Sequence, residues 1–198
     1  MKANFWMSMA MISLTSCQHA GSQYLTEDDI PEFIEAHLIQ QYAQTNGLTS
    51  AKLPVEVVLE DGIKQIYMDT LKESVSYFIP TSRDYFLYGD LTGNQQEDVV
   101  VGVRNVCGVN QDKEIFFLFT GYNDRLSYVR TFESTLLADC SSIGRYPPKL
   151  KFVKIAENRL YGTSICYGPE DAPCCPSLAH ETIFVYDSAT KELVVQSE

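Results

Sequence analysis

The chain has 198 residues, of which 45% are hydrophobic and 21% are charged. This is the composition of a soluble globular protein, and it is too apolar for a disordered chain. The 15 basic and 26 acidic residues give a formal net charge of −11. Because such a surface repels phosphate groups, we expect no nucleic-acid partner and no polybasic membrane patch.

The N-terminus has the pattern of a bacterial lipoprotein signal peptide. Lys2 precedes a ten-residue, mostly apolar run at 5–14, which suits a signal-peptide core and is too short to span a bilayer. The run ends in LTSC at 14–17, which resembles the lipobox. That resemblance implies removal of residues 1–16 and acylation of Cys17, where several acyl chains give stable anchoring. The alternatives are an ordinary secretory leader and a buried N-terminal helix.

The residues after the lipobox suggest a location and a domain plan. Gln18 follows the cysteine where an aspartate would favour retention in the inner membrane. By resemblance to Gram-negative sorting, we expect a protein anchored in the outer membrane and facing the periplasm. We expect residues 17–25 to form a lipidated tether and residues 26–198 to form one domain.

The first regular element of that domain is predicted to be a helix at 28–46. Thr26 and Asp29 have the spacing of a capping box, and Pro31 is compatible with the first turn of a helix. The apolar residues from Ile30 to Ala43 then recur at helical spacing. Gly47 is a typical stop signal.

Beyond Gly47 the pattern changes to short β-like runs separated by Gly, Asn and Asp. The expected strands are 54–59, 85–88, 98–104, 114–120, 127–132, 150–155, 160–167, 182–186 and 193–196. The stretch 64–76 fits either a strand or a helix. Because no long alternation of strands and helices occurs, we predict an α+β fold. Its N-terminal helix packs on a mainly antiparallel β-sheet, and disulfides staple its loops.

The segment DLTGNQQED at 90–98 resembles the acidic turn of FG-GAP repeats, which can hold calcium as an EF-hand loop does. The candidate calcium ligands are Asp90, Asn94 and Asp98. Gln95 stands where that pattern has the glycine of the sharp bend. The favoured interpretation is therefore a hairpin turn, in which Asp90 and Asn94 bond to nearby amides and Gly93 supplies the unusual dihedral angles. We expect no other metal or cofactor.

Five cysteines remain if Cys17 carries lipid, and export to an oxidising compartment favours disulfides among them. The disulfide candidates are Cys107, Cys140, Cys166, Cys174 and Cys175. Five is an odd number, so at most two internal bridges can form. We expect Cys107 to pair with Cys140, and Cys166 to pair with Cys174 or Cys175. The alternative is a metal site built from Cys166, Cys174, Cys175 and His180, although its spacing is untypical of zinc.

Two motifs together resemble a known group of exported proteins. DLTGNQQEDVVV at 90–101 and YGPEDAPCCPS at 167–177, in this order and after a lipobox, resemble small bacterial lipoproteins of the LppP/LprE type. The resemblance covers about residues 84–187. It departs at Asn94-Gln95 and at Ala172. It implies a fold and an exported location, and it implies no activity.

We therefore expect a lipid-anchored envelope lipoprotein with a non-enzymatic binding or structural role. Its partners would be the membrane, through the anchor, and an envelope protein. One alternative is an acidic inhibitor or immunity-type protein that blocks a secreted toxin or hydrolase. A second is a periplasmic hydrolase that uses Ser164, Ser177 and His180, although no catalytic motif is present.

Overall fold

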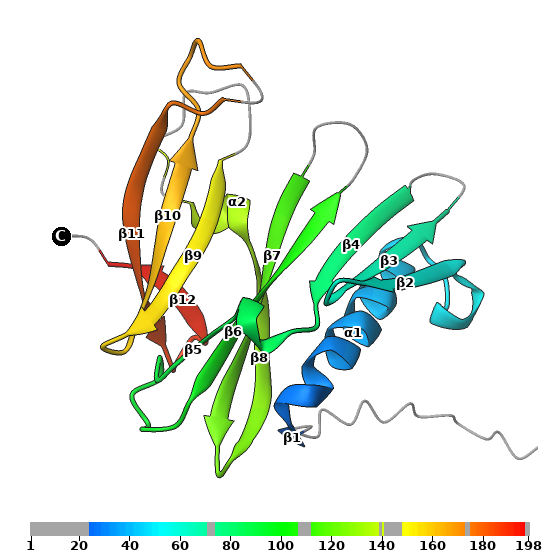
Figure 1. Cartoon of the computed structure of the whole chain (residues 1–198), viewed down its shortest axis with the longest axis horizontal. Coiled ribbons are helices and arrows are strands. Elements are labelled where there is room, and N and C mark those ends of the chain that lie inside the picture. Colours follow the sequence, from blue (N-terminus) through cyan, green and yellow to red (C-terminus); the bar gives the residue numbers. More distant parts are fainter. Residues whose placement is uncertain are drawn as a thin grey trace, which may run out of the picture.

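The computed structural model describes residues 24–70, 74–106, 112–138, 140, 148–172 and 175–196 (Figure 1). The expected signal peptide, Cys17, Cys107 and Cys174 lie outside these residues. Within the described ranges, no helix has the length and apolar character needed to cross a bilayer.

The main helix, α1 (Ile30–Thr45), follows a 3-10 turn, η1 (Glu27–Asp29), and agrees with the helix predicted at 28–46. The backbone N–H and the hydroxyl of Thr26 donate to the carboxylate of Asp29 at 2.8 and 2.6 Å. These bonds hold the start of the helix where the capping pattern placed it. The buried residues of α1 are Ile30, Pro31, Ile34, Leu38, Tyr42 and Ala43.

The helix ends in a Schellman motif at the predicted stop. The N–H of Gly47 donates to the carbonyl of Gln44 at 3.1 Å, and the N–H of Leu48 donates to the carbonyl of Ala43 at 2.8 Å. Gly47 has a φ of +66°, a left-handed conformation that glycine adopts at little cost.

The rest of the described chain consists of strands and short helical turns. The larger sheet contains β1 (Tyr24–Leu25), β2 (Val55–Glu60), β3 (Ile63–Asp69), β4 (Ser74–Pro80), β5 (Phe86–Gly89), β6 (Asp98–Val106), β7 (Asp112–Tyr122) and β8 (Arg125–Glu133). The smaller sheet contains β9 (Lys149–Ala156), β10 (Arg159–Cys166), β11 (Leu178–Asp187) and β12 (Glu192–Val195). The short elements are η2 (Ser50–Lys52), η3 (Arg83–Tyr85) and α2 (Ser134–Leu137).

Both sheets are antiparallel, which confirms the predicted fold class. The larger sheet has the order β1-β8-β7-β6-β4-β3-β2, with β5 paired to the first half of β6. The smaller sheet has the order β12-β11-β10-β9. Each expected strand coincides with an observed one, and the ambiguous stretch 64–76 holds parts of β3 and β4. The last two residues of the expected tether form β1, which pairs with β8.

The elements form three layers, with α1 and the smaller sheet on opposite sides of the larger sheet's central strands (Figure 1). Successive residues of a strand point to opposite faces. On β6, Val99 and Val101 therefore join the core under α1, while Val100 joins the core between the sheets. On β7, Phe117 and Phe116 divide in the same way.

The smaller sheet covers only part of the larger one. Its first strand, β9, packs against β5, β7 and α2. On β2 and β3, at the far end of the larger sheet, side chains on the face turned away from α1 remain exposed. They include Val58, Ile63 and Tyr67. The larger sheet therefore extends beyond its cover, and a groove lies along that boundary.

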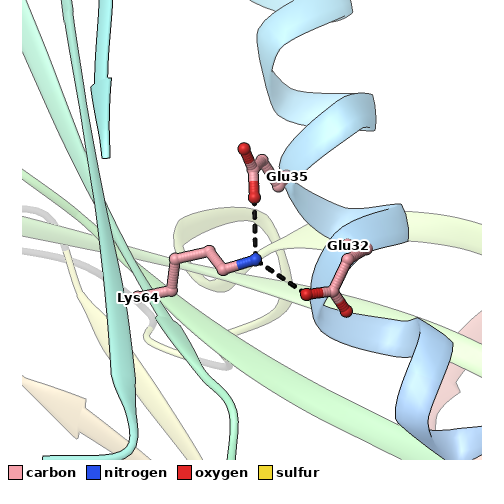
Figure 2. A network of polar contacts seen from close by, with 3 residues as sticks. All are labelled: Glu32, Glu35 and Lys64. Atoms are coloured by element: carbon pink, nitrogen blue, oxygen red, sulfur yellow. Dashed lines mark hydrogen bonds and ion pairs between the residues drawn. The ribbon is translucent and has the colours of Figure 1, made fainter. Parts of the chain in front are cut away.

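One ion-pair network ties α1 to the larger sheet (Figure 2). The Nζ of Lys64, on β3, donates to Glu32 at 2.9 Å and to Glu35 at 2.8 Å, both on α1. The Lys64 side chain is only 12% exposed. Burial alone would lower the pKa of Lys64, but its hydrogen bonds to the two glutamates raise the pKa above the ordinary value. The pKa of Glu32 is lowered, chiefly by its bond to Lys64.

We expect Lys64→Met to lower the free energy of unfolding by about 1–2 kcal/mol, because a largely buried cation and its two hydrogen bonds are lost. Since the pKa of Glu32 is depressed, its contribution is present above the ordinary value of 4.5 and is lost as the pH falls through the folded value. Lys64→Met should flatten this acid dependence. Urea melts between pH 3 and 7 measure both effects, with the exposed Lys52→Met as control. Equal melts for both variants would contradict the role of the network.

Candidate functional site

Asp90 organises the turn at 90–98. Its Oδ1 accepts the backbone N–H groups of Gly93 and Asn94 at 2.7 and 3.1 Å, and its Oδ2 accepts that of Gln95 at 2.9 Å. Gly93 has a φ of +75°, as the hairpin interpretation predicted. Gln95 also has a positive φ, +64°, a conformation that strains a residue with a Cβ.

Asp98 is fully buried at the start of β6. Its Oδ2 accepts the N–H groups of Leu91 and Thr92, both at 2.8 Å. Its Oδ1 accepts the N–H of Gly121, on β7, at 2.9 Å. Burial raises the pKa of Asp98, while the three backbone donors act in the opposite direction. One carboxylate therefore fastens the turn to the end of β7.

The oxygens of the three candidate calcium ligands accept hydrogen bonds from backbone N–H groups. Both oxygens of Asp90 and both of Asp98 accept backbone N–H groups, and Oδ1 of Asn94 accepts the N–H of Gln96 at 2.8 Å. The positive ends of amide dipoles thus point at the oxygens that a cation would need. Calcium binding at this turn stays an alternative to the hairpin interpretation. Across the described part of the chain, no three or more His, Cys, Asp or Glu side chains are grouped to hold a metal ion.

The cysteine pairing differs from the expected one. Cys140 forms a disulfide with Cys166, with the two Cα atoms 5.8 Å apart. Both expected pairings, Cys107 with Cys140 and Cys166 with Cys174 or Cys175, are therefore wrong. The metal site that included Cys166 is also wrong, because that sulfur is in a disulfide. The bridge connects the segment after α2 to the end of β10, a sequence separation of 26 residues, instead of closing the local loop after β10.

A carboxylate, that of Asp171, closes the Pro-rich loop after β10, where a disulfide of Cys166 with Cys174 or Cys175 was expected. Oδ2 of Asp171 accepts the N–H of Gly168 at 2.5 Å and the N–H and hydroxyl of Ser177 at 2.8 and 2.9 Å. These donors lower the pKa of Asp171. Asp171 therefore supplies the closure expected of Cys166, and Cys175, on the same loop, is exposed.

The two serines proposed for a hydrolase, Ser164 and Ser177, form hydrogen bonds with different residues. The Ser164 hydroxyl is fully buried and lies 2.6 Å from the hydroxyl of Thr182. The Ser177 hydroxyl donates to Asp171. His180 is exposed on β11, directly opposite Ser164 in the β10–β11 register. A hydrolytic role for these residues stays a hypothesis.

One hollow of about 390 Å³ lies beside the 90–98 turn and is mainly polar. It is lined by residues of both charges, and two of them, Arg83 and Glu27, form an ion pair. The Tyr88 hydroxyl also donates to Glu27 at 3.3 Å. The other charged residues of its lining are Asp28, Glu97, Asp124 and Arg125, so acidic groups outnumber basic ones in this hollow.

A second hollow, of about 360 Å³, lies where the larger sheet extends beyond the smaller one. Its apolar lining includes Ile63, Phe78, Leu87, Val100, Phe116 and Phe152. Phe78, Arg104 and Glu114 stand directly opposite one another across β4, β6 and β7, so they share one face. Phe152 and Lys151 enter from β9.

A smaller hollow of about 180 Å³ lies next to it and shares Arg104 and Glu114 with it. Lys113 and Lys149 also line this smaller hollow. We call the two hollows together the inter-sheet groove. Burial raises the pKa of Glu114, and the nearby charges of Lys151, Lys149 and Arg104 oppose that rise. The groove is thus apolar along one part and predominantly cationic along the other.

The groove could not be predicted from the sequence because its residues come from strands that are far apart in the chain. One usable signal was present on β9, where Lys149 and Lys151 alternate with the buried Leu150 and Phe152. That alternation places two lysines on one side of a strand. It does not show that Arg104 lies beside them.

We expect Asp98→Ala to destabilise the protein by about 3 kcal/mol or more, because three backbone N–H groups lose one charged acceptor and two of its donors are buried. Chemical denaturation measures the loss. Asp187→Ala is the matched control, since Asp187 also accepts backbone N–H groups, but in an exposed turn. Similar losses for the two variants would contradict the structural role of Asp98.

Comparisons with models of known families, with characterised proteins and with solved structures find no match to this chain. The resemblance carried by 90–101 and 167–177 therefore stays a prediction. Several residues singled out in those motifs bond to backbone groups, whereas the inter-sheet groove offers an open surface lined by apolar and charged residues.

Proposed function

We propose that the protein is a lipid-anchored envelope lipoprotein with a non-enzymatic binding role, and that the inter-sheet groove is its binding surface. The support for the anchor is the lipobox pattern at 14–17. The support for binding is the groove itself, in which apolar and charged side chains from both sheets converge. Concave, mainly apolar surfaces with a few polar groups are the usual form of a ligand site.

The observation that carries the binding role is that the groove belongs to rigid elements. Its walls are strands whose other residues are buried in the two cores. A surface of this kind exists before the ligand arrives, so little conformational entropy is lost on binding. The groove therefore suits recognition without rearrangement of the fold.

We expect Cys17→Ser to abolish membrane attachment, since the thiol that would accept the acyl chains is removed. Fractionation of cells, together with intact mass of the full chain, measures attachment, leader removal and acyl mass in one preparation. Cys175→Ser is the matched control and should stay attached. A Cys17→Ser protein that remains in the membrane and is correctly cleaved would contradict the anchor.

We expect a photoreactive benzoylphenylalanine in place of Tyr85 to capture the natural ligand or partner in intact cells. Tyr85 is 58% exposed and lines the groove. The matched control is the same substitution at Val153, which is 54% exposed on β9 and does not line either hollow of the groove. Mass spectrometry should find a discrete adduct at position 85 and none at 153. Equal labelling at the two positions, or none, would contradict the groove as the binding surface.

A further inference from the structure

We infer that the inter-sheet groove binds a small molecule with an apolar body and a single anionic head group. This inference rests on the binding function proposed above and adds the chemical class of the ligand.

The apolar part of the groove is suited to the body of such a molecule. Its volume of about 360 Å³ falls within the range of small-molecule sites. Three strands contribute aromatic rings to it, those of Phe78, Phe116 and Phe152. The ring centres of Phe116 and Phe152 lie 4.2 Å apart. Gly102, also in the lining, allows the Phe116 ring to pack closely against β6, since a Cβ there would lie 3.3 Å from that ring.

The charged part of the groove is suited to an anionic head. Three cationic residues, Arg104, Lys149 and Lys151, lie near the single carboxylate of Glu114 and line one or both hollows. Lys113 also lines the smaller hollow, but it is adjacent to Glu114 on β7, so its side chain starts from the opposite face of that strand. In a chain with a formal net charge of −11, such a local excess of positive charge is unusual. The field that it creates attracts anions to this place and repels cations.

Arg104 lies at the boundary between the two parts. Its guanidinium carbon is 5.7 Å from the centre of the Phe78 ring, which belongs to the apolar lining. A guanidinium group can give two parallel hydrogen bonds to a carboxylate or a phosphate. A head group bound there would leave its apolar body lying along the Phe78 side of the groove. This position determines the orientation of the ligand.

The experiment separates the contributions of head and body. The full chain in lipid nanodiscs, with empty nanodiscs as the blank, is titrated calorimetrically with decanoate and with monodecyl phosphate. Decanol tests the body without a charge, decyltrimethylammonium tests the opposite charge, and acetate tests the head without a body. We expect decanoate or decyl phosphate to bind at least tenfold more tightly than the other three probes. The comparison between those two distinguishes a carboxylate from a phosphate head.

Two charge variants test the site. Arg104→Gln and Lys151→Gln should each weaken binding of the anionic probe about tenfold, which corresponds to about 1.4 kcal/mol. Lys154→Gln is the matched control, since Lys154 also lies over an aromatic ring, that of Tyr161 at 4.7 Å, but outside the groove. Gly102→Leu should block the apolar part and abolish binding. Thermal melts show whether each variant folds. If Gly102→Leu does not fold, the two charge variants still test the site, because Arg104 and Lys151 are exposed.

Three results would overturn the inference. They are equal affinity for decanol and decanoate, unchanged binding in both charge variants, or an adduct at position 85 that is a protein. The third result would leave the proposed binding function intact, because the groove would then bind a macromolecule. Absence of any adduct at position 85 would contradict the function itself.

Discussion

The structure depends on two strands that are buried on both faces. Because side chains alternate along a strand, β6 and β7 supply Val101 and Phe117 to the core under α1 and Val100 and Phe116 to the core between the sheets. A register shift of one residue would exchange the two sets of side chains, so both cores constrain the same register. The four-stranded sheet covers only part of its eight-stranded neighbour, and the inter-sheet groove is the consequence.

Local signals predicted much of the fold. Thr26 and Asp29 marked the start of α1, Gly47 marked its end, and alternating apolar residues marked the strands. The stretch 64–76 stayed ambiguous because its pattern fits either a strand or a helix. Its residues form strands because β3 pairs with β2 and β4 pairs with β6. Tertiary contacts override local preference in such cases. The disulfide was mispredicted for a related reason: Cys140 and Cys166 are 26 residues apart in the chain, and it is the tertiary fold that brings their Cα atoms to 5.8 Å.

The candidate site was harder to predict than the fold. The two sequence motifs contain Asp90, Asp98 and Asp171, and all three carboxylates bond to backbone amides and so hold the fold together. The cations of the groove carry no motif, because Arg104 and Lys151 come together only through the packing of β9 against β5 and β7. An overall acidic composition also concealed a local positive surface. Local sequence patterns indicated the turns, whereas the charged surface depends on the topology.

The exposed edge strand β2 has a further consequence for self-association. Val57, Val58 and Leu59 lie open on this edge, which has no neighbouring strand among the described residues. Apolar edges of this kind invite pairing between molecules. Glu56 and Glu60 flank the three residues, so antiparallel pairing of two copies centred on Val58 would set each Glu56 against a Glu60 of the other copy. Like charges directly opposite one another destabilise such a pair, and the edge therefore discourages fibre formation through its own sequence.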